Sequence, residues 1–169
     1  WAMSYVKGLD LLGMKIEERQ QPWAGSSGVF HPILTESIVR FQAQAMGEIY
    51  PASGPVRTKI IGKMSVEKTE QALRVENEMN YLLTEEMTEY RDETEQMLFK
   101  LPLAGSAFKK VYYDPIMERP CAMFVPAEDF VVSYGASDLM TCERYTHVMK
   151  KTSNDIMKLM NNGFYRDIQ

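Results

Sequence analysis

The sequence predicts an α+β fold in which a long helix, or a pair of helices, packs on a small mixed or antiparallel sheet. Residues 66–101 repeat apolar side chains every three to five positions and contain no Gly or Pro, which is typical of a helix. Residues 108–134 are rich in aromatic and β-branched side chains and are divided by turn residues, which is typical of strands. With 45% hydrophobic and 25% charged residues among 169, the composition is that of a globular protein.

We interpret residues 1–169 as a single fragment of a larger subunit, because the chain begins at Trp1 and a new segment begins, without finishing, at Phe164. Four parts are expected: a strand, a helix and a strand in 1–63, a long acidic helix or two helices in 64–101, a small β-sheet in 102–150, and a short helix with the start of the next segment in 151–169. No internal repeat divides these parts further.

Two strands are predicted in the first part. Leu12, Met14 and Ile16 alternate with glycine and charged residues, and Val56–Ile61 alternates in the same way. Between them a helix is expected from Pro32, which suits a first helical turn, to the stop at Pro51. Its buried stripe is predicted to comprise Leu34, Ile38, Phe41, Ala45 and Ile49.

A loop is predicted over Gln20–Gly28, where Pro, Gly and Ser residues accumulate. Trp23 within it is a candidate anchor for a partner protein, and packing back onto its own domain is the alternative.

The acidic part begins at Ser65, a good N-cap residue. A second helix with Thr84 or Thr88 as its cap is equally compatible with the pattern, so one helix and two remain open. This part carries 10 Asp and Glu against 4 Lys and Arg. We expect its acidic face to be a solvated helix surface, with an acidic docking face as the alternative.

The sheet part is expected to follow a helix end at Leu101-Pro102, because a residue before proline avoids the α conformation. Strands are predicted over residues 108–113, 122–125, 130–134 and 144–149. A short helix capped by Ser153 or Asn154 and closed by Gly163 completes the chain.

The sequence lacks several common motifs of enzyme active sites. Gly62-Lys63 lacks the earlier glycine and the following hydroxyl residue of a phosphate-binding loop. The two histidines, His31 and His147, stand outside any HExxH pattern, and no GxSxG occurs. We therefore predict no catalytic residue, no metal and no cofactor.

Two cysteines, Cys121 and Cys142, are expected to be free thiols. A net charge of −4 and a pI near 5.3 argue against a surface that grips DNA phosphates. No apolar run approaches the about 20 residues that cross a bilayer, and no signal peptide opens the chain, so a soluble protein is expected.

Two charged pairs lie in the sheet part. Lys109 and Lys110 are neighbours on a strand, so their side chains should point to opposite faces; edge protection or a subunit salt bridge is favoured over contact with DNA. Glu128-Asp129 is expected to cap a turn, and acid chemistry is the alternative. The candidate interface residues are Trp23, Lys109, Lys110, Tyr112 and Tyr113.

A family resemblance is carried by five strings, which are FHPILTESIVRFQAQAMGEIYPASGPVRTKIIG, VENEMNYLLTEEMTEY, LPLAGSAFKKVYYDP, FVPAEDFVVSYGASDL and ERYTHVMKKTSNDIMKLMNNGFYRDI. In this order they resemble the portal proteins, or head-to-tail connectors, of short-tailed bacteriophages of the larger podovirus type. The resemblance runs from about Gly13 onward and departs from the family in length, since the stem helices, clip and crown would follow this chain's end.

The resemblance implies a structural subunit rather than an enzyme, and this segment would be an N-terminal piece of the outer wing region. Portal subunits form an oligomeric ring, usually a dodecamer, at one capsid vertex of the virion, and are assembled in the host cytoplasm. DNA packaging by the terminase and DNA ejection both use the channel, without sequence-specific binding. The implied partners are capsid, scaffolding, terminase and tail adaptor proteins, with no membrane.

The isolated fragment is expected not to form a large oligomer, because the family's tightest ring contacts lie in segments outside it. Two other functions are kept as alternatives. One is a metal-dependent hydrolase built on Glu128, Asp129 and His147; the other is a stand-alone helical adaptor that docks through residues 66–101.

Overall fold

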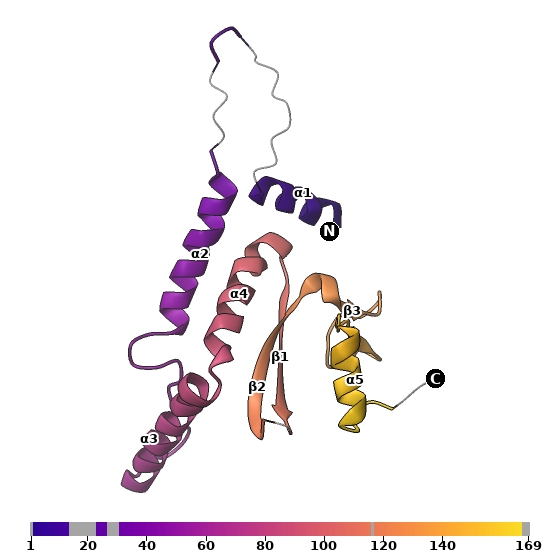
Figure 1. Cartoon of the computed structure of the whole chain (residues 1–169). Coiled ribbons are helices and arrows are strands. Elements are labelled where there is room, and N and C mark those ends of the chain that lie inside the picture. Colours follow the sequence, from indigo (N-terminus) through magenta and orange to yellow (C-terminus); the bar gives the residue numbers. More distant parts are fainter. Residues whose placement is uncertain (1, 14–22, 27–30, 116, 167–169) are drawn as a thin grey trace. The chain divides into compact units, whose positions relative to one another are not determined.

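The computed structural model describes residues 2–13, 23–26, 31–115 and 117–166. Its elements are α1 (Ala2–Leu12), α2 (Ile33–Ile49), α3 (Val66–Tyr81), a π-helical turn (Leu82–Glu86), α4 (Glu89–Ala104), β1 (Ala107–Asp114), β2 (Arg119–Pro126), a 3-10 turn (Ala127–Asp129), β3 (Phe130–Val132), β4 (Tyr145–His147) and α5 (Ser153–Asn161) (Figure 1). The α+β class is confirmed. The chain divides into two compact units, Trp1–Ala127 and Glu128–Gln169.

The first unit begins with a helix, α1, that was not predicted. α1 buries Tyr5, whose hydroxyl accepts a hydrogen bond from Lys100 Nζ of α4 at 3.4 Å. Leu12 is the last residue of α1, and the other two residues of the predicted strand, Met14 and Ile16, lie outside the described residues. The predicted strand is therefore tested only at Leu12, which is helical.

α2 is confirmed between Pro32 and Tyr50. Ile38 lies at the centre of its buried side and is 2% exposed. It is the only buried member of the predicted stripe: Phe41 and Ile49 are 43% and 38% exposed, and Leu34 and Ala45 are half-buried. The covered face is narrower than predicted because α2 packs mainly against one neighbour, α4.

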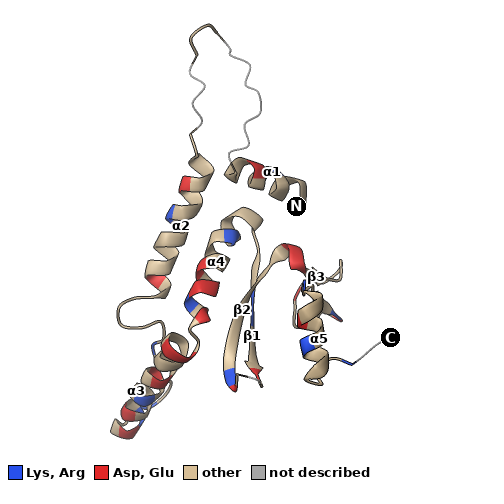
Figure 2. Ribbon diagram, in the orientation of Figure 1, with Lys and Arg blue, Asp and Glu red and all other residues tan. Residues whose placement is uncertain are grey.

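The acidic part forms two helices joined by the π-helical turn. Ser65 caps α3 as predicted, its hydroxyl accepting the Lys68 N–H at 3.3 Å. Neither threonine caps α4 with its side chain: Thr84 Oγ1 donates to the Asn80 carbonyl at 2.8 Å, and Thr88 makes no capping bond. Met87 is 2% exposed and fixes the junction by burial. The Asp and Glu residues are spread along both helices (Figure 2).

The predicted end of α4 at Leu101-Pro102 is wrong, because the helix continues to Ala104. Pro102 has no N–H to bond to the Leu98 carbonyl, and it disfavours the α conformation of Leu101, so the last turn of α4 must be stabilised by other contacts. Burial of Leu98 and Ala104, 4% and 7% exposed, favours the additional residues. Gly105 then ends the helix at φ 75°, with its N–H bonded to the Leu101 carbonyl at 2.8 Å.

The predicted strand over Val56–Ile61 is also wrong, since the structure assigns no strand there. The segment runs against α3 and is bonded to side chains instead of to another strand. Asn80 accepts the Val56 N–H at 2.9 Å and donates to the Val56 carbonyl at 3.2 Å. Glu76 accepts both the N–H and the hydroxyl of Thr58 at 3.0 Å.

The strands form two antiparallel pairs. β1 pairs with β2 in a register that places Val111 opposite Ala122 and Lys109 opposite Phe124. The third predicted strand, β3, pairs with β4 and not with β2. α4 packs against both β1 and β2, and the core of the first unit lies between them. Its buried residues include Leu98, Ala104, Cys121, Ala122 and Val125.

The second unit holds β3, β4 and α5. Thr152, rather than Ser153 or Asn154, caps α5 by accepting the Asp155 N–H at 3.2 Å. The predicted ending is confirmed: Gly163 has φ 73°, and the Phe164 N–H bonds to the Leu159 carbonyl at 2.9 Å. Among its described residues none is fully buried.

Candidate functional site

Four of the five predicted interface residues lie on β1 and alternate between its faces. Lys109 and Tyr113 share one face, and Lys110 and Tyr112 share the other. Lys110 and Tyr113 are exposed, the latter at 63%. Trp23 lies in a separate turn and is 68% exposed.

Lys109 is turned toward α4 and is not available to a DNA strand. Its ammonium group contacts Thr94 Oγ1 and lies 3.9 Å from the centroid of the Tyr90 ring. Thr94 also receives a hydrogen bond from the Tyr50 hydroxyl at 3.2 Å. Burial lowers the pKa of Lys109, and the nearby Glu93 carboxylate partly opposes this. The side chain therefore joins strand to helix inside the unit.

The opposite face of β1 carries Lys110 and Tyr112. The Lys110 ammonium lies 5.1 Å from the Tyr112 ring centroid, a separation at which a cation attracts an aromatic face. Burial raises the pKa of the Tyr112 hydroxyl, and the neighbouring acidic groups Cys121 and Asp114 add to the rise. The phenol is therefore neutral at physiological pH.

The outer edge of β2 is closed by two glutamates of α4. Glu93 Oε2 accepts the Phe124 N–H at 2.5 Å, and Glu89 Oε1 accepts the Ala122 N–H at 3.4 Å. Because N–H groups of a strand alternate in direction, the remaining outward positions of β2 are Pro120 and Pro126, which have no N–H. No outward N–H donor of β2 is left for another strand.

Glu89 also binds Arg119 at the start of β2. The guanidinium Nη1 lies 2.8 Å from Glu89 Oε2 and 3.0 Å from Oε1, with both side chains about a quarter exposed. Burial alone would raise the pKa of Glu89, but hydrogen bonds from its own N–H, from Arg119 and from Ala122 lower it. Most acidic side chains of residues 64–101 are exposed, as predicted, whereas Glu89 and Glu93 are structural acceptors.

The outer edge of β1 is open. The N–H groups of Ala122 and Phe124 point away from β1, where the glutamates accept them. In an antiparallel pair, two residues directly opposite each other either bond to each other or both point outward. Val111 and Lys109, which stand opposite Ala122 and Phe124, therefore point their backbone N–H and C=O groups away from β2. Within the part of the chain that the structure describes, no group bonds to the outward N–H or C=O of Lys109, Val111 or Tyr113. Val111 is 64% exposed beside this edge.

The glutamates were missed by sequence reasoning, although a signal exists. Glu89 and Glu93 are four apart on a helix, a rise of about 6 Å, and Ala122 and Phe124 are two apart on a strand, about 6.7 Å. Prolines at 120 and 126 mark the same edge. Two glutamates at i and i+4 on a helix, followed by a strand with prolines on alternate positions, would have suggested that the carboxylates accept the strand's outward N–H groups.

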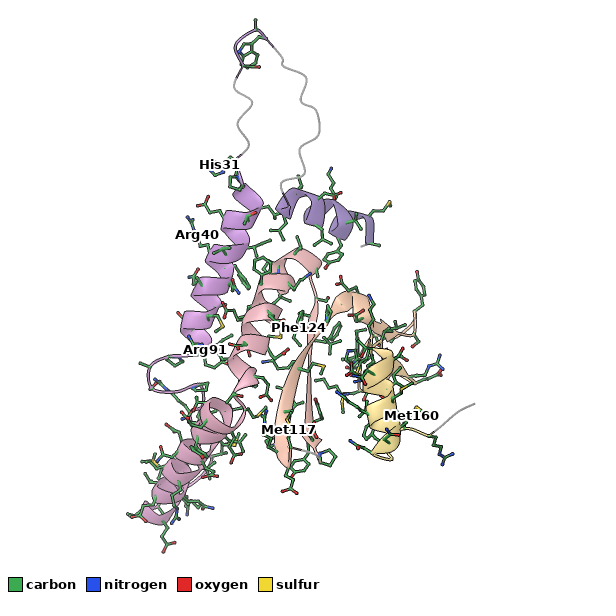
Figure 3. All side chains as sticks on the ribbon, viewed as in Figure 1. His31, Arg40, Arg91, Met117, Phe124 and Met160 are labelled. Atoms are coloured by element: carbon green, nitrogen blue, oxygen red, sulfur yellow. The ribbon has the colours of Figure 1, made fainter. Side chains whose placement is uncertain are left out.

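Small hollows exist beside these elements. Phe124, labelled in Figure 3, lines one of about 290 Å³ together with Gln96 and Phe99 of α4. In the second unit a hollow of about 440 Å³ is bordered by Val131, Ser133 and Arg144 among others.

The residues proposed for acid or metal chemistry do not form a site in the described chain. No group of three or more His, Cys, Asp or Glu there is placed to hold a metal ion, and Glu128, Asp129 and His147 are no exception. Asp129 uses its backbone carbonyl to accept the Val148 N–H at 2.8 Å. His147 Nδ1 is buried without a hydrogen-bond partner among the described groups.

The cysteines are free, as predicted. Cys121 is buried, and Cys142 is partly exposed, 3.4 Å from Ser133 Oγ. No helix of the described residues has the length and apolar character needed to span a membrane. No protein-family model matches the chain, and no curated protein matches its sequence.

Proposed function

We propose that this chain is the N-terminal wing-region piece of a bacteriophage portal subunit. The observation that carries the proposal is the set of five strings between residues 30 and 168, which follow one another in the order found in portal proteins of short-tailed phages. In this role the chain contributes geometry rather than catalysis. The assembled ring is the conduit for DNA packaging and ejection and the attachment point for terminase and tail proteins.

The surface of the first unit is suited to contacts between protein subunits. A cyclic ring needs a different patch on each side of a subunit, because its contacts are heterologous. The chain offers several exposed apolar side chains on separate elements, among them Ile33 on α2, Leu73 on α3 and Val111 on β1. A net charge of −4 also suits a particle whose channel lets DNA slide, since tight phosphate binding needs clustered Lys and Arg.

The test uses the full-length protein. The reading frame should continue past Gln169 into a long helix, and negative-stain images should show rings. A capsid reconstruction should place the protein at one vertex. Monomers alone at every concentration, or its absence from the unique vertex, would contradict the proposal.

A helical adaptor is the second candidate, because α3 buries none of its residues and exposes Leu73, Val75 and Met79. A natural chain that ends near Gln169 and binds a partner through α3 would favour it over the portal. The hydrolase is tested separately by titration with divalent metals and a nuclease and esterase screen, in which turnover would support it.

A further inference from the structure

The two outer edges of the β1–β2 pair differ in whether their backbone groups have hydrogen-bond partners. The edge of β2 is closed, and the edge of β1 is open to another strand. Prolines and the Glu89 and Glu93 carboxylates occupy the edge of β2. The edge of β1 keeps its outward backbone groups, and Val111 and Tyr113 beside them are 64% and 63% exposed. An open edge of this kind is a template for another strand.

We propose that β1 pairs with β1 of a second copy of this chain, antiparallel across a two-fold axis. Such a contact is isologous: if residue i of one copy contacts residue j of the other, residue j of the first copy also contacts residue i of the second. The backbone directions restrict the register, because alternate residues of β1 present outward groups and hydrogen-bonded pairs must come from this set, which is Ala107, Lys109, Val111 and Tyr113. Among the registers built from this set, only one brings Lys110 opposite Asp114.

Charge decides between the registers that remain. If Val111 pairs with Tyr113 of the second copy, Lys110 stands opposite Asp114 on both sides of the axis. If Val111 pairs instead with Val111 of the second copy, Lys110 stands opposite Tyr112 and no opposite-charge pair forms. A further shift of two residues in that direction sets Lys110 against Lys110, which is unfavourable for directly opposed like charges. The first register supplies two opposite-charge pairs and covers both exposed side chains of the edge.

The contact is small, because one strand a side buries less than the about 1,200 Å² typical of stable complexes. A reversible dimer that forms as concentration rises is therefore expected. A two-fold contact closes after two copies and cannot build a ring. The inference thus stands apart from the portal proposal and is compatible with a fragment that forms no large oligomer.

The first test is Val111→Pro, examined by sedimentation equilibrium over a wide concentration range. Proline removes the outward N–H of Val111 and leaves the bonds to β2 in place, because that N–H points away from β2. Dimer affinity should fall at least tenfold. Val111→Thr, which keeps the N–H and the β-branched shape, should retain the dimer. A wild-type chain that stays monomeric, or a dimer unaffected by the proline, would overturn the proposal.

The second test exchanges the charges and does not depend on the proline variant folding. Lys110→Glu and Asp114→Lys should each weaken self-association, because each places two like-charged pairs in the dimer. An equimolar mixture should restore it, since the glutamate introduced in one copy then faces the lysine introduced in the other. Asp114 also accepts the Met117 N–H at 3.3 Å, so Asp114→Asn serves as the control for the turn. A mixture that associates no better than either variant alone would show that another segment occupies the edge, and would overturn the pairing.

Discussion

Two regions of the first unit hold an extended segment against a helix in the same way but in different surroundings. On α3, Glu76 and Asn80 bind the backbone of Thr58 and Val56; on α4, Glu89 and Glu93 bind that of Ala122 and Phe124. In both, side chains four apart on a helix meet N–H groups two apart on an extended chain.

The regions differ in burial. α3 has no buried residue, whereas α4 buries Thr94 and Leu98 and β2 buries Ala122, each no more than 4% exposed. The hydrogen bonds of both regions are partly buried, but the buried residues around those of α4 leave less room for water to replace a lost acceptor than on α3. A buried donor left without a partner carries its full desolvation cost. An equivalent hydrogen bond should therefore contribute more to the free energy of unfolding on α4 than on α3. Four experiments test this difference.

The largest effect is expected for Glu93→Ala, which leaves the Phe124 N–H without its acceptor. We expect the free energy of unfolding to fall by about 2.5 kcal/mol, within the range of about 1.5–3 kcal/mol for hydrogen bonds to charged groups. Urea unfolding followed by circular dichroism measures it. Glu95→Ala, an exposed glutamate on the same helix, should change stability by less than about 0.5 kcal/mol. Equal losses for the two variants would contradict the capping role of Glu93.

A second effect concerns two glycines with positive φ, one in each region. Gly105 has φ 75° and open space around it, so Gly105→Ala should cost about 1 kcal/mol from strain alone. At Gly54, φ 96°, a Cβ would lie 2.7 Å from Asn80 Cγ, so Gly54→Ala should cost about 2 kcal/mol. In an Asn80→Ala background the excess at Gly54 should disappear. If it persists, the clash with Asn80 is not its cause.

Asn80→Ala by itself should cost about 1 kcal/mol, because two partly exposed hydrogen bonds to Val56 are exchanged for bonds to water. Asn77→Ala is a matched control, since Asn77 is exposed on the same helix. Hydrogen exchange at the Val56 amide should accelerate in the first variant only. A cost equal to that of Glu93→Ala would remove the contrast between the regions.

The smallest effect is the acid dependence. Hydrogen bonds from the N–H and then the hydroxyl of Thr58 lower the pKa of Glu76 below its ordinary 4.5. The unfolded chain therefore binds the proton first, so this stabilisation is present above about pH 4.5 and is lost as pH falls through the lower, folded pKa. Glu76→Gln should narrow the difference between urea midpoints at about pH 7 and about pH 3. An unchanged difference would show that Glu76 is not held this way in solution.

Several features could be predicted because they depend on nearby residues. Ser65 caps α3 through the N–H three positions later, and Gly163 ends α5 through bonds that span five residues. The β1–β2 hairpin follows from the turn at Asp114-Pro115 between two apolar runs. The opposite directions of Lys109 and Lys110 follow from strand geometry alone.

Other features depended on distant residues, and local patterns gave the wrong answer or none. Val56–Ile61 alternates like a strand, but its backbone partner is Asn80, 24 residues away. Phe124 bonds to Glu93 across 31 residues. Pro102 would stop a helix in isolation, yet burial of Ala104 extends α4 past it.

Local sequence alone was enough to give the α+β class, the position of α2, the start of α3 at Ser65, the end of α5 at Gly163 and the free state of both cysteines, because periodicity, caps and turns are encoded within a few residues. Three features became visible only in the folded chain. Lys109 faces α4, and the strands form two separate pairs. One edge of the β1–β2 pair is closed, and the other is open. The physical reason is that an extended backbone must find its hydrogen-bond partners in another segment, and chain topology decides which segment arrives there.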